Sequence, residues 1–159
     1  MIEKTGVAPL ELIKSKFPTM EVLLKPKAII ECYQQIPCNP CETSCPTHAI
    51  TIGEDINQIP IIDFDKCTGC SICARVCPGL AISIVMIKDS KVFFKIPYEL
   101  LPLPSKGEKW TCVNREGIVL DELCLIENVQ ISKDKTALIT VSLKDKYLYH
   151  FSTIRSKYE

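Results

Sequence analysis

The sequence lacks the features that would place it in a membrane, in a secretory pathway or on nucleic acid. No apolar run approaches the roughly 20 residues that a bilayer-spanning helix needs. Charged residues interrupt the apolar ones between Met1 and Thr19, unlike in a secretory signal. Lysine plus arginine equals aspartate plus glutamate, at 19 each, so no net charge favours an anionic partner. We therefore expect a cytoplasmic protein with no membrane span and no nucleic-acid partner.

Familiar catalytic signatures are also missing. The sequence shows no glycine-rich phosphate loop, no Ser-His-Asp set, no paired-carboxylate site and no flavin or nicotinamide fingerprint. We expect no catalytic residue in this chain.

Cysteine, by contrast, is abundant, with ten cysteines among 159 residues. Eight of them form two dense groups, and each group ends in Cys-Pro. The first group is Cys32, Cys38, Cys41 and Cys45, and the second is Cys67, Cys70, Cys73 and Cys77. The second group has the spacing C-x2-C-x2-C-x3-C-P, which is the thiolate pattern of bacterial iron–sulfur sites. The sequence thus favours clusters over structural disulfides, which belong mainly to exported proteins. A zinc-binding interaction module is the remaining alternative.

The two cysteine groups belong to an internal repeat. A shift of 32 residues places Cys38 on Cys70, and the following cysteines, prolines and Ala-Ile pairs overlay as well. Cys67 falls on Gln35, which cannot supply a thiolate, so Cys32 is the candidate replacement. Each copy is expected to contain a strand, a ligand loop, a short helix opened by the Cys-Pro turn, and a second strand. The expected strands are 28–32 and 50–52 in the first copy, and 59–63 and 82–87 in the second.

Residues 28–87 resemble the bacterial two-cluster 4Fe–4S ferredoxins. The similarity lies in the run from Cys67 to Cys73, in the two Cys-Pro turns and in the Ala-Ile pairs after them. A narrower segment, ECYQQIPCNPCETSCP at 31–46, looks like the iron–sulfur subunits of FAD-dependent amine and amino-acid dehydrogenases of the proline, hydroxyproline or sarcosine type. The resemblance implies a subunit that receives electrons from a flavin.

The resemblance also implies a ligand assignment. In two-cluster ferredoxins the cysteine before proline ligates the other cluster. Two 4Fe–4S clusters are therefore expected. Cluster 1 would take Cys32, Cys38, Cys41 and Cys77, and cluster 2 would take Cys67, Cys70, Cys73 and Cys45. If Cys32 is only a buried strand thiol, cluster 1 would be a 3Fe–4S cluster or would carry a non-cysteine ligand.

The flanks of this region predict further structure. We expect an N-terminal arm at 1–27 with a helix at 9–17, the ferredoxin module at 28–88, a linker with one strand at 89–106, and a β domain at 107–159. The arm either packs on its own domain or docks a partner subunit. The strands expected after the module are 92–96, 108–113, 118–120, 123–131, 136–141 and 147–151. Cys112 and Cys124 lie in apolar strands and suit a buried core, with a disulfide or an extra metal site as the alternative.

Together these patterns predict an α+β protein with a pseudo-twofold two-cluster ferredoxin module, an N-terminal helical arm and a small antiparallel β domain, either barrel or sandwich. Its expected role is to relay single electrons inside a larger, flavin-dependent complex, as one chain of a hetero-oligomer. A free-standing ferredoxin shuttle is the alternative, although shuttles often have a surface of one charge sign.

Overall fold

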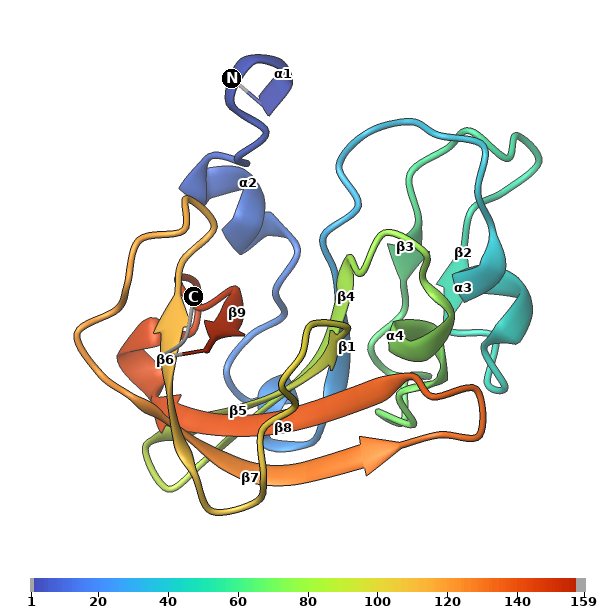
Figure 1. The fold of residues 1–159 in the computed structure, drawn as a ribbon. Helices are drawn as coiled ribbons and strands as arrows, with labels where there is room; N and C mark the ends of the chain where they lie inside the picture. Colours follow the sequence, from blue (N-terminus) through green and yellow to red (C-terminus); the bar gives the residue numbers. More distant parts are fainter. Residues whose placement is uncertain (1, 157–159) are drawn as a thin grey trace.

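The computed structural model describes residues 2–156, and a seven-stranded antiparallel sheet forms its centre (Figure 1). The strand order is β1-β4-β5-β8-β7-β6-β9. These strands are β1 (Lys27–Ile30), β4 (Ile82–Lys88), β5 (Lys91–Tyr98), β6 (Lys109–Val113), β7 (Cys124–Ile131), β8 (Ala137–Lys144) and β9 (Thr153–Arg155). A separate two-stranded sheet pairs β2 (Ile50–Thr51) with β3 (Ile61–Ile62).

The helices are short and lie at the periphery of the sheet. They are α1 (Ile2–Thr5), α2 (Leu10–Ser15), α3 (Pro40–Ser44), α4 (Ile72–Val76) and the 3-10 turns η1 (Val22–Leu24) and η2 (Asp145–Tyr147). Figure 1 shows α3 and α4 with the small sheet on one side of the molecule, and α2 on the other side. Within residues 2–156, no helix has the length and apolarity to cross a bilayer.

Strands β1 and β4 join the cysteine-rich region to the rest of the sheet. Successive side chains of a strand face opposite sides of a sheet. Accordingly, Ala28 and Ile30 pack into a core with the cysteines, while Ile29 between them packs into a larger core formed by β5, β7 and β8. The two cores therefore lie on opposite faces of the same strands. The sequence predicted a ferredoxin module and a β domain as separate segments, whereas the structure continues one sheet through both.

The repeat is visible in the strand pairing. Ile30 of β1 pairs with Ile82 of β4, and the residues 32 positions away pair in the same way, since Ile62 pairs with Ile50. Two equivalent backbone bonds of 2.8 Å extend these pairs, from Glu31 N–H to the Ala81 carbonyl and from Asp63 N–H to the Ala49 carbonyl. The first strand of each copy thus pairs with the last strand of the other.

The predicted position of the short helices is wrong. They precede the Cys-Pro turns, because α3 ends at Ser44 and α4 at Val76. Cys45 and Cys77 are C-caps with extended ψ angles of 115° and 116°. A residue before proline is pushed out of the helical region, so the Cys-Pro bond ends each helix.

Two strands predicted in the C-terminal part are also corrected. Residues 118–120 form no strand and contribute only an isolated bridge between Val113 and Val119. Residues 147–151 form a turn in which the Phe151 N–H donates to the Tyr147 carbonyl over 3.0 Å. The turn buries both aromatic side chains, so their spacing of four positions reflects helical rather than strand geometry. The other strands predicted in the flanks, 92–96, 108–113, 123–131 and 136–141, are confirmed to within a few residues.

Candidate metal centre

The eight grouped cysteines line two separate cavities, four in each. One cavity is lined by Cys32, Cys38, Cys41 and Cys77. The other is lined by Cys45, Cys67, Cys70 and Cys73. Each set takes three cysteines from one repeat and the Cys-Pro cysteine from the other. Cys45 and Cys77 lie at the ends of α3 and α4, and these two helices pack against each other. The structure therefore brings the residues together in the two sets named from the sequence, and their role as ligands remains a prediction.

The thiols within each set lie close enough to influence one another. Burial raises the pKa of Cys41 to about 11, and the charges of Cys77, Cys38 and Cys32 add to the rise. Burial likewise raises the pKa of Cys73 to about 12, with further contributions from Cys67, Cys70 and Cys45. Four thiolates this close repel one another, so their ionised forms need a positive partner such as iron.

Backbone amides donate to three of the sulfur atoms. Ala49 N–H donates to Cys45 Sγ over 3.3 Å, and the equivalent Ala81 N–H donates to Cys77 Sγ over 3.4 Å. These bonds need a tight turn after each Cys-Pro. His48 and Leu80, the preceding residues, adopt left-handed φ angles of 55° and 52° to make it. Ala28 N–H of β1 donates to Cys67 Sγ over 3.3 Å. Such bonds stabilise thiolates and tune the potential of a bound cluster.

Gly69 allows the second ligand loop to pass close to the chain before β1. Its φ is +72°, and a Cβ there would lie 2.7 Å from the Pro26 carbonyl oxygen. Both the backbone angle and the contact make any larger residue at this position unfavourable. The local sequence gives no sign of this close partner.

An ion pair beside Cys32 was not predicted. The Arg115 Nε donates to Glu31 Oε1 over 2.7 Å, and its guanidinium also donates to the Tyr149 carbonyl over 2.6 Å. The Tyr33 hydroxyl donates to the same Glu31 oxygen over 2.9 Å. The pair spans 84 positions of sequence, and no local pattern signals a contact at such separation. It ties the turn after β6 to the residue that precedes the first cysteine of the repeat.

The arrangement fits iron–sulfur clusters in donor chemistry and shape. Within residues 2–156, no three His, Cys, Asp or Glu side chains converge closely enough to hold a single metal ion. Each cysteine set instead surrounds a hollow with apolar walls, such as Ile30, Ile36 and Ile82 in the first cavity. A cubane presents iron at separated corners, so it needs thiolates around a hollow rather than around a point.

The remaining candidate residues lie outside both cavities. Cys112 and Cys124 are fully buried in the larger core and are not disulfide-bonded, and their thiols donate to the Glu122 and Trp110 carbonyls. His48 and His150 are exposed. These observations agree with a structural role for the two cysteines.

Comparison with known proteins identifies a family match in the cysteine-rich region. Residues 36–81 match the family described as the 4Fe-4S dicluster domain. This segment is a ferredoxin-type domain. It contains seven of the eight grouped cysteines, and Cys32 lies four residues before it. A dicluster domain with eight cysteines between positions 32 and 77 implies two 4Fe–4S clusters and an electron-transfer role. No solved structure gives a significant match.

Several curated relatives share the same segment. One of the subunits of sulfite dehydrogenase from Allochromatium vinosum is 37% identical over 62 residues, which are 39% of this chain and 24% of that protein. The polyferredoxin-like subunit of aliphatic sulfonate oxidoreductase from Pyrococcus furiosus is 32% identical over 48% of this chain and 39% of its own length. One of the subunits of an ion-translocating oxidoreductase complex from Methanosarcina acetivorans is 41% identical over 31% of this chain and 17% of its own length. The chain therefore spans well under half of the length of each of these relatives.

Proposed function

We propose that this chain is the electron-transfer subunit of a larger, flavin-dependent oxidoreductase complex. The observation that carries the proposal is the pair of cavities, each with four cysteines drawn from both repeats. Helices α3 and α4, which each end at a Cys-Pro cysteine, pack together. Two 4Fe–4S clusters in one such domain can pass single electrons from one to the other. The relatives named above support a place in a complex, because several of them are subunits of oxidoreductases.

The ligand assignment forms part of the proposal. Cluster 1 takes Cys32, Cys38, Cys41 and Cys77, and cluster 2 takes Cys67, Cys70, Cys73 and Cys45. The grouping of the thiols around two hollows supports this crossing. The protein surrounds each site with apolar side chains and directs backbone N–H groups at sulfur.

Anaerobic recovery of the tagged chain from its native host tests the proposal. We expect about eight irons and eight sulfides per chain, together with a larger subunit that contains flavin. A brown chain recovered alone, with full iron, would indicate a free-standing ferredoxin. A colourless chain that contains zinc would overturn the electron-transfer role altogether.

A further inference from the structure

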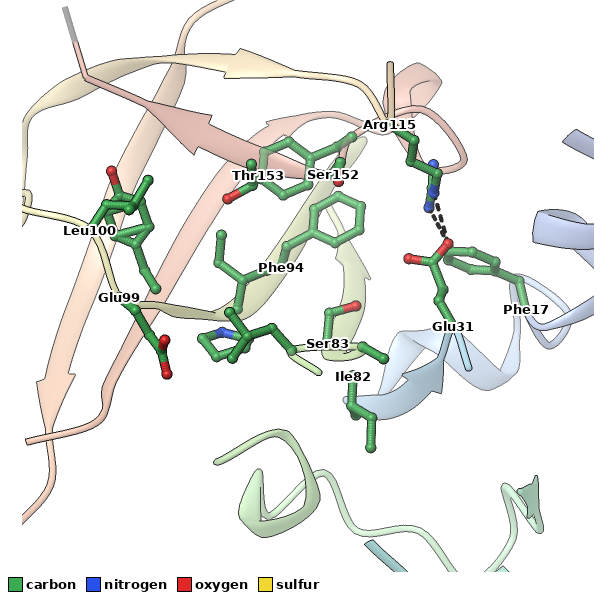
Figure 2. Close-up of a pocket in the computed structure, with 16 residues that line it drawn as sticks. Phe17, Glu31, Ile82, Ser83, Phe94, Glu99, Leu100, Arg115, Ser152 and Thr153 are labelled. Carbon is green, nitrogen blue, oxygen red and sulfur yellow. Dashed lines mark hydrogen bonds and ion pairs between the residues drawn. The ribbon is translucent and has the colours of Figure 1, made fainter. Parts of the chain in front are cut away.

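A third cavity, of about 410 Å³, lies beside cluster site 1 and contains none of the cysteines. This volume is within the range of small-molecule sites. Figure 2 shows Phe94 in its middle, with Phe17, Glu31 and Arg115 toward one end and Glu99 and Leu100 toward the other. The rings of Phe94 and Phe151, 4.6 Å apart, form an aromatic wall. Such walls favour a flat, apolar ring as ligand.

The cavity and cluster site 1 share a wall. Ala81 and Ile82 line both the cavity and the hollow that holds Cys32, Cys38, Cys41 and Cys77. Moreover, the Ala81 N–H is the donor to Cys77 Sγ. A ring in the cavity would thus lie one layer of side chains from the cluster site, a separation suited to electron transfer.

The charges of the cavity favour a neutral ligand over a nucleotide. Among the described residues, two carboxylates, Glu31 and Glu99, line it, against the single cation Arg115. Arg115 is already engaged by Glu31 and by the Tyr149 carbonyl. A phosphate would find little positive charge there. The hydroxyl-bearing residues Ser83, Ser152 and Thr153 also line the cavity and can donate to carbonyl oxygens.

We propose that this cavity binds the ring of a neutral quinone and that cluster 1 reduces it. The inference rests on the proposed function, under which a flavin donor reduces both clusters. The bound quinone takes two electrons, one originating from each reduced cluster, and two protons from water. It leaves as the quinol, and both clusters return to their oxidised state.

Binding of ubiquinone-1 tests the inference directly. Its fully substituted ring resists addition of thiols, and equilibrium dialysis against the air-free protein with oxidised clusters measures its Kd without turnover. Leu100 lines the cavity mouth, whereas Leu101 beside it is 80% exposed and does not line the cavity. We expect Leu100→Asp to weaken binding about tenfold, because an apolar contact is replaced by a charge. Leu101→Asp is the matched control and should bind as the parent does.

A second variant closes the cavity from inside. Ser83 lies on β4, and Ser83→Leu should abolish ubiquinone-1 binding while an unchanged cluster absorbance spectrum confirms that the variant is folded. FMN serves as the charged flat-ring probe and should not bind. Equal weakening by both aspartate variants, or FMN binding as tight as that of ubiquinone-1, would overturn the inference.

The outcomes separate this inference from the proposed function. A sample with full iron that shows no saturable ubiquinone-1 binding overturns the quinone site and leaves the electron-transfer role intact. A sample without iron overturns both the electron-transfer role and the reduction of quinone. If Leu100→Asp loses a partner subunit while the parent binds no quinone, the cavity is a protein contact and the inference is wrong.

Discussion

At the scale of single residues, the second ligand loop can pass close to Pro26 only because Gly69 has no side chain. We expect Gly69→Ala to destabilise the protein by about 2 kcal/mol, because alanine is strained at positive φ and its Cβ would meet the Pro26 carbonyl. Anaerobic urea unfolding, followed by cluster absorbance, measures this change. Gly79→Ala is the control, since Gly79 has an ordinary φ and open space around its Cβ. Equal effects of the two substitutions would contradict this account.

The crossing of ligands gives a second prediction for single residues. Cys32 and Cys77 are far apart in sequence but line the same cavity. We therefore expect Cys32→Ser and Cys77→Ser to alter the same cluster, and Cys45→Ser to alter the other. Electron paramagnetic resonance of the reduced variants, with iron analysis, distinguishes the two clusters.

Gln35→Ser is the control for these cysteine variants, because Gln35 is exposed and replaces a cysteine of the repeat. If Cys45→Ser alters the same cluster as Cys32→Ser, and Cys77→Ser alters the other, the crossed assignment is disproved. Unchanged iron and spectra in Cys32→Ser would remove Cys32 from the ligand set.

At the scale of elements, Glu31, which follows β1, is held by a contact from Arg115, 84 positions further along the chain. The side chains of Arg115 and Glu31 are only 14% and 23% exposed. Removing one partner leaves the other charge poorly solvated. We expect Arg115→Met to reduce the free energy of unfolding by about 1–3 kcal/mol.

A double-mutant cycle with Glu31→Gln isolates the contribution of this pair. Glu116→Met is the matched control, because Glu116 is the exposed neighbour of Arg115. Additive effects of Arg115→Met and Glu31→Gln would show that the pair contributes nothing to stability.

At the scale of the whole molecule, the two cores differ in how much they depend on metal. The smaller core contains Cys41 and Cys73 and packs against further cysteines, whereas the larger core is formed by β5, β7, β8 and the turn around Phe151. We expect anaerobic iron chelation to unfold residues 32–80 while β5, β7 and β8 stay protected, because metal binding and folding of small sites are coupled.

Hydrogen–deuterium exchange with mass spectrometry follows both regions in one sample. The parent protein with its clusters intact is the control. Simultaneous loss of protection in β8 and in α3 would show that the chain behaves as one cooperative unit, and that the larger core cannot persist without iron.

Local patterns predicted the elements whose form depends on near neighbours. Strands 28–32 and 82–87 were found close to their expected bounds, since β-branched runs alternate between two buried faces. The helix position failed because proline was taken to start a helix, whereas here the residue before it ends one. The prediction of a strand at 147–151 was wrong because the apolar spacing of this segment fits both a strand and a turn.

The sequence by itself determined the cysteine spacing, the 32-residue repeat and hence the chemistry of two iron–sulfur sites, because ligand loops of two or three residues leave a chain few ways to curl. Only the tertiary structure decided that one sheet joins the cysteine region to the C-terminal strands, that Arg115 reaches Glu31, and that a cavity shares a wall with cluster site 1. These features depend on contacts between residues far apart in sequence. Such contacts depend on how entire faces of the strands pack together, and a short stretch of sequence does not encode that packing.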